Sequence, residues 1–351
     1  MPKIKANGIE IEYDCFGNHE AEAVLLISGL GTQMIRWSES FCQLLANQGY
    51  RVIRFDNRDA GLSTHFHSAS MPNLAAIADA ISRGETPNMP YTLFDMANDA
   101  VELLNSLMIK RAHVVGRSMG GMIAQLLASE HAERVLSLVS MMSSTGNRDL
   151  PQASPAVMAA MTSPAPHPLK DEQAYLAHCV AFSQLIAGRG YPFEESAQRE
   201  QALAEVKRAY NPSGFWRHIA AIAATGDLRS RLANISAPTL VLHGSDDPLV
   251  PPEAGKDTAA HIKGAELKLP PKSRQLFKEF KIVPVSATAA RRCPVIRTTS
   301  LPCFSFPAFL NQAVQHQIYS RSWHHRPRLS YTPFPVFDNP MIDVYAQRCR
   351  T

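Results

Sequence analysis

Short apolar runs alternate with longer amphipathic stretches along most of this chain, and the alternation limits the folds that it can adopt. Apolar runs bounded by turn residues predict strands at residues 8–13, 23–28, 51–55, 112–115, 135–141, 238–243 and 265–269. Helical patterns lie between several of these runs, at residues 37–48, 93–107, 120–130 and 228–233. Such alternation predicts an α/β fold with a mostly parallel sheet, helices on both faces and ligands at the carboxyl ends of the strands.

The strand pattern stops between residues 144 and 225. Amphipathic helical patterns at 172–186 and 194–210 follow a proline-rich lead-in at 151–168. Because a strand pattern resumes at residue 238, we expect residues 144–225 to form a helical cap inserted into a core of residues 1–143 and 226–280. A separate helical domain is the alternative.

Residues 281–351 differ in composition from the rest of the chain. They contain nine Lys and Arg residues against only Asp338 and Asp343. No glycine occurs in the 87 residues after Gly264, although average usage of about 7% would supply roughly six there. Because no helical or strand period is sustained there, we expect a poorly ordered, divergent tail. A frame shift or a fusion near residue 270 would account for it.

The overall composition excludes several classes of protein. With 45% hydrophobic and 19% charged residues, the chain is typical of soluble globular proteins. The early apolar runs have strand length, so we predict neither a signal peptide nor a membrane span and expect a cytoplasmic protein. The net charge of +4 is concentrated in the tail, which argues against a nucleic-acid-binding face. Nothing in the sequence fixes an oligomeric state.

Cofactor and metal motifs are missing from the sequence. The six cysteines have no CxxC or CxxH spacing, which argues against a zinc site or a disulfide framework. We find no Walker A, dinucleotide-binding or metal-ligand pattern. We therefore expect no cofactor.

The segment from Gly116 to Gly120 fits the pattern G-x-S-x-G and lies between a predicted strand and a predicted helix. A tight strand-to-helix turn of this kind strains the backbone of the serine, and a Cβ at the flanking glycines would collide with neighbouring elements. A serine hydroxyl becomes a nucleophile when a base lies within hydrogen-bond reach. We predict that Ser118 is the nucleophile of an acyl-transfer reaction.

Such a serine also needs hydrogen-bond donors for the oxyanion that develops during attack. The backbone N–H of Met119 is one candidate, because it opens the following helix, where the helix dipole also favours negative charge. The N–H of Leu30 is the second, since Gly29 and Gly31 allow the loop to turn its amides inward. A plain glycine turn without this role is the alternative for Leu30.

Four segments in this order resemble the α/β-hydrolase superfamily: LLISGLGTQ, RVIRFDNRDAGLST, VVGRSMGG and LVLHGSDDPLVP. The resemblance covers about residues 5–269 and is greatest to esterases of the aclacinomycin methylesterase type. It implies cleavage of a carboxylic ester of a small, moderately apolar molecule through an acyl-enzyme. It also implies that Asp247 is the acid of a catalytic triad, with Asp246 as the alternative. Ser28 stands where relatives have histidine, which should alter loop packing more than chemistry.

The histidine of the triad is the missing member. In this fold the order along the chain is serine, acid and histidine, with the histidine on the loop after the last strand. No histidine occurs between His261 and His316. The tail could fold back and offer His324 or His325; alternatively, the sequence leaves the family pattern near Leu269 and has lost its base.

Other histidines have plainer interpretations. His113 lies at the wrong end of its strand, His243 closes the strand before the acid, and His261 precedes the last strand, so we interpret them as structural. His65, His67, His178 and His218 are interpreted as surface or cap residues.

Three further positions qualify the functional interpretation. Asp56 and Arg58 are expected to tie loops together by charge-assisted hydrogen bonds. Arg117 either contacts an acidic substrate or, more simply, is exposed or paired with the cap.

A serine rather than an aspartate at residue 118 disfavours dehalogenase and epoxide hydrolase chemistry. A perhydrolase or carbon–carbon bond hydrolase of the same fold stays open, as does a non-catalytic binding protein or decayed pseudoenzyme.

Overall fold

The computed structural model describes residues 1–85, 87–187 and 192–270. These residues form one eight-stranded sheet made of β1 (Lys3–Ala6), β2 (Ile9–Phe16), β3 (Ala23–Ile27), β4 (Arg51–Phe55), β5 (Ala112–Arg117), β6 (Val135–Met141), β7 (Thr239–Leu242) and β8 (Glu266–Lys268). The strand order is β1-β2-β4-β3-β5-β6-β7-β8. β2 pairs antiparallel with both β1 and β4, and every later pair is parallel. The predicted mostly parallel sheet is confirmed.

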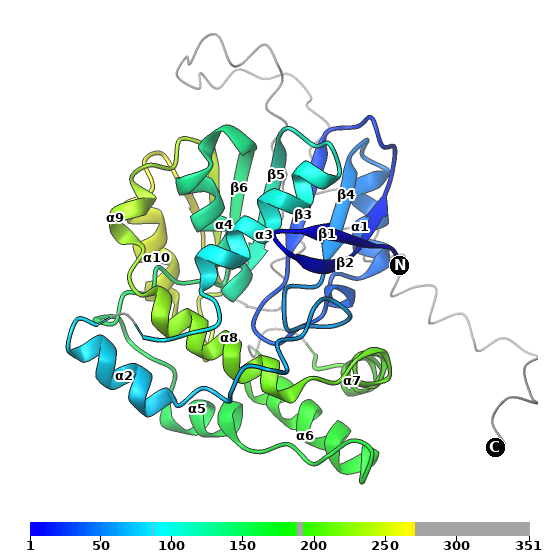
Figure 1. Cartoon of the computed structure of the whole chain (residues 1–351), viewed down its shortest axis with the longest axis vertical. Coiled ribbons are helices and arrows are strands. Elements are labelled where there is room, and N and C mark those ends of the chain that lie inside the picture. The colour runs from blue at the N-terminus through cyan, green and yellow to red at the C-terminus, as the bar shows by residue number, and fades with distance from the viewer. Residues whose placement is uncertain (86, 188–191, 271–351) are drawn as a thin grey trace, which may run out of the picture.

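The helices divide into two groups along the chain (Figure 1). Those outside the segment 144–225 are α1 (Glu39–Ala46), α2 (Leu74–Ser82), α3 (Leu93–Ser106), α4 (Met119–Glu130), α9 (Arg229–Leu232) and α10 (Pro252–His261), with short 3-10 turns η1 (Met34–Arg36) and η2 (Ala132–Arg134). Between β6 and β7 lie α5 (Pro155–Thr162), α6 (Glu172–Leu185), α7 (Glu195–Arg208) and α8 (Pro212–Thr225). In the described residues no helix is long and apolar enough to cross a bilayer.

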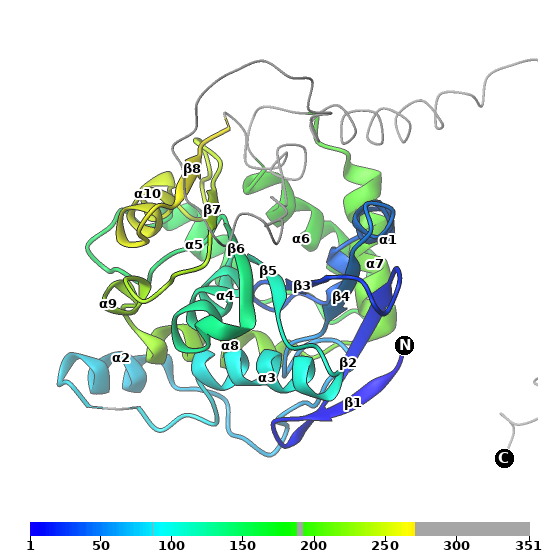
Figure 2. The same ribbon diagram turned by 90° about the horizontal axis from the view of Figure 1, so that it is seen from above.

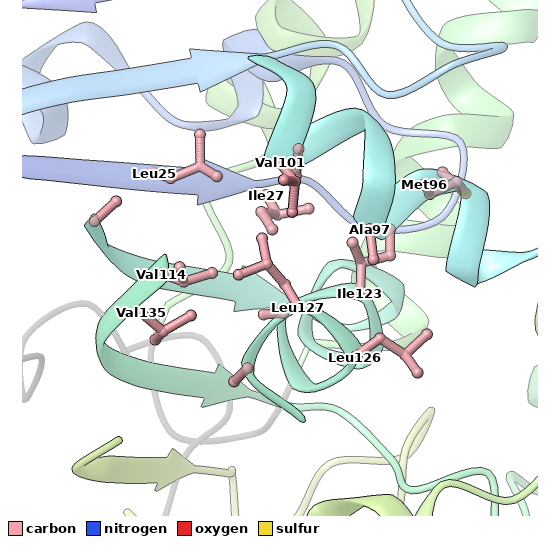
Figure 3. Close-up of a cluster of buried hydrophobic side chains, with 14 of the residues drawn as sticks. Leu25, Ile27, Met96, Ala97, Val101, Val114, Ile123, Leu126, Leu127 and Val135 are labelled. Carbon is pink, nitrogen blue, oxygen red and sulfur yellow. The ribbon is translucent and has the colours of Figure 1, made fainter. Parts of the chain in front are cut away.

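β3 is buried on both faces because helices cover the sheet on either side. Leu25 and Ile27 belong to the core that includes residues of α3 and α4, and Figure 3 shows them in one cluster with Ile123 and Leu127. The alternate residues of β3 join Cys42 and Leu45 of α1 in a second core. A strand covered on both faces has a continuous apolar sequence. This is why residues 23–27 were recognisable as a strand.

α8 connects the helices α5–α8 to the carboxyl ends of the parallel strands. His218 of α8 accepts a hydrogen bond from the amide of Gly31, shortly after β3, and its other ring nitrogen contacts the carbonyl of Arg58, shortly after β4. Figure 1 shows α5–α8 gathered at one end of the molecule. Figure 2 shows the strands across the sheet, from β8 at one edge to β1 at the other. These helices therefore stand over the edge of the sheet where residue 118 lies.

Several elements were not predicted from the sequence. β1 was not predicted; it pairs with β2 across Asn7 and Gly8, whose φ angles of 49° and 76° are typical of a two-residue hairpin. α2 was also not predicted. The proline-rich lead-in at 151–168, for which no helix was predicted, contains α5, where Ser154 caps the amide of Val157 and Pro155 occupies the first turn.

Candidate active site

Ser118 is the single residue between β5 and α4. Its φ of 55° and ψ of −123° lie outside the regions favoured by residues with a side chain. Two contacts with the neighbouring strand and its loop hold this turn: the amide of Ser118 donates to the carbonyl of Met141 at 2.9 Å, and the hydroxyl of Ser143 donates to the carbonyl of Ser118 at 2.8 Å. Strain of this kind costs on the order of 1–3 kcal/mol and persists only where surrounding structure enforces it.

The glycines around Ser118 are required by close packing of backbones. A Cβ at Gly116 would lie 2.0 Å from the carbonyl oxygen of Gly120, and a Cβ at Gly120 would lie 2.3 Å from that of Ile27 in β3. Both distances are far shorter than any van der Waals contact. The bend and the first turn of α4 can therefore pack against β3 only when these side chains are absent.

We expect Gly120→Ala to destabilise the fold by about 2–3 kcal/mol, because the added methyl group meets backbone that cannot move without disturbing the sheet. Urea denaturation followed by circular dichroism measures this loss. A change in unfolding free energy below about 0.5 kcal/mol, the usual range for harmless substitutions, would show that the turn tolerates a side chain.

Two backbone amides near Ser118 have no acceptor in the described part of the chain. Met119 is the first residue of α4, and first-turn amides lack a partner within their helix. In the loop after β3, the amide of Gly31 is used by His218 and that of Thr32 by the carbonyl of Gly29, whereas the Leu30 amide is left available. A Cβ at Gly29 would lie 3.3 Å from the Cβ of Ser118, so this loop passes directly beside the serine.

His218 fixes the shape of that loop, a role that the sequence did not reveal. Its side chain is fully buried, and its Nε2 lies 2.7 Å from the carbonyl oxygen of Arg58. Because a carbonyl only accepts, Nε2 carries the proton, and Nδ1 accepts from the amide of Gly31 at 3.2 Å. Burial lowers the pKa of His218 below its ordinary value, which favours this neutral form. Both ring nitrogens are occupied, in agreement with the prediction that His218 is not the base.

If His218 positions the loop of Leu30, its replacement should slow turnover more than it weakens substrate binding. We expect His218→Leu to lower kcat for ester hydrolysis by about 10- to 100-fold with KM changed less than threefold, since a small displacement of catalytic groups has effects of this size. The conservative His218→Asn variant can still accept from Gly31 and should recover part of the loss. If both variants had the same kcat as the wild type, His218 would not position the loop of Leu30 for catalysis.

Asp247 lies on the same edge of the sheet as Ser118. The last paired residues of three neighbouring strands are in register, Arg117 with Met141 and Met141 with Leu242, and Asp247 follows shortly after β7. Two strand spacings separate β5 from β7, or about 10 Å. This is the sheet edge at which an acid that serves Ser118 must lie.

The carboxylate of Asp247 is buried and held in place by its own loop. Its Oδ1 accepts hydrogen bonds from the amides of Leu249 and Val250, both at 3.0 Å. Burial nevertheless raises the pKa of Asp247 above its ordinary value, which the two amide bonds only partly oppose. Asp246, the alternative acid, is exposed. The geometry therefore favours Asp247 as the residue with a fixed, desolvated carboxylate.

In the described part of the chain no hydrogen bond joins a histidine to Ser118 or Asp247. His113 contacts Ser137 at the start of β5, and His243 lies beneath the acid loop with its Nε2 against the carbonyl of Val250 at 2.7 Å. Both are structural, as expected. The predicted candidates His324 and His325 lie outside the described residues. Those residues also contain no group of three or more His, Cys, Asp or Glu side chains that could hold a metal ion.

The backbone follows the expected path as far as the point where the histidine loop should begin. β8 is the last strand of the sheet and pairs with β7. Beyond it, the carbonyl of Pro270 accepts from the amide of Ser245 in the acid loop at 3.0 Å. The loop that would carry the histidine starts after this contact, outside the described residues.

Buried ion pairs fasten the loops after β4 to other elements. The carboxylate of Asp59 accepts two hydrogen bonds of 2.7 Å from Arg217 of α8 and one of 2.6 Å from the hydroxyl of Tyr91. Although burial would raise the pKa of Asp59, these bonds hold it at about 2. Arg58 makes two bonds of 2.6 Å with Asp99 of α3. Arg58 therefore ties loops together, as predicted.

Asp56 has the same structural role. Its carboxylate accepts from the amides of Met34 at 2.7 Å and Leu62 at 3.0 Å, and from Arg208 of α7 at 2.6 Å. The prediction that Asp56 connects loops agrees with these contacts. With the Asp59 pair, it attaches both α7 and α8 to the sheet edge that carries Ser118.

Comparison with known proteins identifies the family to which the chain belongs. Residues 22–280 match the model of a family described as alpha/beta hydrolase fold. Rhodomycin D methylesterase DauP of Streptomyces sp. (strain C5) is 27% identical over 260 residues, which cover 70% of this chain and 81% of the relative. The putative carbamate hydrolase RutD of Variovorax paradoxus (strain S110) is 30% identical over 267 residues, or 74% of this chain and 87% of the relative.

A solved structure supports the fold independently. The enol-lactonase from Burkholderia xenovorans LB400 matches with a TM-score of 0.58 at 24% identity, over 78% of this chain and 92% of that chain. At this identity, the likeness concerns the fold alone.

Proposed function

Because this chain belongs to the α/β-hydrolase fold family, we propose that it cleaves carboxylic esters of small apolar molecules through a covalent acyl-serine intermediate. The observation that carries the proposal is the strained bend at Ser118, which presents a hydroxyl beside the available amides of Met119 and Leu30. A bend of this kind serves to expose a nucleophile. Relatives that are named as a methylesterase and as a putative carbamate hydrolase support the assignment of chemistry.

In the proposed reaction, Ser118 Oγ forms a bond to the ester carbonyl carbon while its proton passes to a base. The amides of Met119 and Leu30 bind the negative oxygen that results, a contribution of about 3–4 kcal/mol for each donor in other serine hydrolases. Collapse then breaks the bond to the alcohol oxygen, which leaves with the proton. Water next attacks the acyl-serine ester, releases a carboxylic acid and restores Ser118. No cofactor takes part in these steps.

Asp247 would orient the base and stabilise its protonated form. His324 and His325 are the candidates for that base, since they follow Asp247 in the order typical of this fold. If either acts as the base, its replacement by alanine should reduce kcat as severely as loss of the nucleophile. Unchanged kcat in both variants would exclude His324 and His325 as the base.

We also propose that residues 144–225 act as a cap over the site. The contacts of α7 and α8 with the loops after β3 and β4 support this division. Phe215 of α8 lies directly against Gly31: a Cβ added at Gly31 would be 2.9 Å from the ring of Phe215. An apolar side chain at this position favours substrates with an apolar group near the ester.

A non-catalytic binding protein is the second candidate function, favoured by the lack of a described histidine bonded to Ser118. The two can be separated with p-nitrophenyl acetate and butyrate. An acyl-enzyme predicts a burst of nitrophenolate equal to the enzyme concentration, followed by slower steady turnover. Release of nitrophenolate at the uncatalysed rate, without a burst, would contradict the proposed function and support the binding protein.

A further inference from the structure

Arg117 is the last residue of β5 and immediately precedes Ser118. The sequence left three interpretations of Arg117 open: contact with an acidic substrate, exposure to solvent, or an ion pair with the cap. Its guanidinium lies over the ring of Trp37, with the Arg117 Cζ atom 5.5 Å from the ring centroid, and the residue is only partly exposed. In the described part of the chain, its side chain makes no hydrogen bond and no ion pair.

The nearby carboxylate is already neutralised by another cation. Glu205 of α7 receives two hydrogen bonds from Arg36 of η1, at 2.6 Å and 2.7 Å. Both charged groups act on Arg117 electrostatically, the guanidinium of Arg36 unfavourably and the carboxylate of Glu205 favourably. Two cations thus share one carboxylate, which leaves one positive charge without compensation.

The surroundings of Arg117 disfavour its charged form. Burial, followed by repulsion from Arg36, lowers the pKa of Arg117 to about 10. The contact with Trp37 stabilises a cation by about 0.5–2 kcal/mol but supplies neither an opposite charge nor hydrogen-bond acceptors. A partly desolvated guanidinium without acceptors is unfavourable, so the site is suited to an anion that arrives from outside.

The position of this charge connects it with the reaction centre. Consecutive Cα atoms are about 3.8 Å apart, so Arg117 is anchored directly beside the nucleophile. Arg36 lies on the segment that continues from the loop of Leu30, and Glu205 approaches from α7 above the sheet edge. These charged groups therefore belong to the same edge of the sheet as Ser118.

We propose that Arg117 binds a carboxylate of the substrate, so that the preferred esters are half-esters of short dicarboxylic acids. The inference rests on the proposed function and makes it more specific. A carboxylate matches the planar fork of a guanidinium and would supply the missing negative charge and acceptors in one group. The remaining part of the substrate can be apolar.

Monomethyl and dimethyl glutarate test the inference, because they differ by one charge and have the same chain and ester. We expect the wild type to hydrolyse the monomethyl ester with a kcat/KM at least tenfold above that of the dimethyl ester, measured by pH-stat. Arg117→Gln should lower the monomethyl value by about 10- to 100-fold, the range for loss of a charged hydrogen bond, and change the dimethyl value less than twofold. Arg117→Lys should retain part of the preference, and Arg229→Gln, at an exposed ion pair, should retain all of it.

Binding without turnover separates failure of this inference from failure of the proposed function. Calorimetry with the Ser118→Ala protein should detect monomethyl glutarate, and the Ser118→Ala/Arg117→Gln protein should bind it at least tenfold more weakly. Binding that depends on Arg117 without hydrolysis of either ester would overturn only the proposed function. Hydrolysis with no preference for the monomethyl ester, or equal binding by the two proteins, would overturn the role of Arg117.

Discussion

Ser118→Ala is expected to lower kcat for p-nitrophenyl butyrate by up to about a million-fold, to a rate maintained only by binding and by the oxyanion donors. The reason is that the acyl group can then no longer be transferred to the protein, so water must attack the ester directly. Alanine keeps the Cβ of the serine and its backbone strain. We therefore expect an unfolding free energy within about 0.5 kcal/mol of the wild type.

Ser106→Ala is the matched control, since Ser106 is an exposed serine whose hydroxyl, among the described residues, donates only to the carbonyl of Lys5. Its kcat should equal that of the wild type. If the Ser118→Ala variant kept more than about a hundredth of the wild-type kcat, the reaction would not proceed through an acyl group on Ser118.

Asp59→Asn should cost about 3–5 kcal/mol of stability, because it leaves Arg217 charged, fully buried and without a counterion. The substitution removes a charge but almost no volume, so cavity formation does not contribute. Urea denaturation at pH 7 measures the loss. Asp227→Asn is the control, since the Asp227–Arg229 pair is solvent-exposed and should contribute only about 0–1 kcal/mol.

The pH dependence of this effect has a definite sign. The pKa of Asp59 is lowered to about 2 in the folded protein, whereas an unfolded aspartate titrates near about 3.9. The stabilisation is therefore fully present above pH 4 and is lost as the pH falls toward 2. The difference in stability between wild type and Asp59→Asn should narrow over this range. A constant difference would mean that the charge of Asp59 does not carry the effect.

The sequence predicted the sheet well where physical constraints are local. Residues 23–27 are covered on both faces and form an unbroken apolar run, and the bend at Ser118 requires glycines because backbones approach within van der Waals distance there. β1 escaped prediction because it is a short edge strand in which only Ala6 is buried. Its clearest signal was the Asn7–Gly8 turn, which identifies a hairpin only when both flanking strands are considered.

The contacts that shape the site come from residues far apart in the sequence. His218 and Gly31 are separated by 187 positions, so nothing adjacent to either residue indicates their hydrogen bond. The sequence left the role of Arg117 open, because its contact with Trp37 and its lack of an ion pair among the described residues depend on how α7 and η1 pack over the sheet edge. Two expectations concern residues outside the described ranges: that the tail is poorly ordered, and that His324 or His325 is the base. Both stay predictions.

Labelling with a fluorophosphonate, followed by mass spectrometry of the digested protein, tests most directly whether Ser118 is an activated nucleophile. The account predicts one covalent adduct, on the peptide that contains Ser118, and none on the Ser118→Ala protein. An unlabelled wild-type protein, or an adduct on another residue, would contradict it.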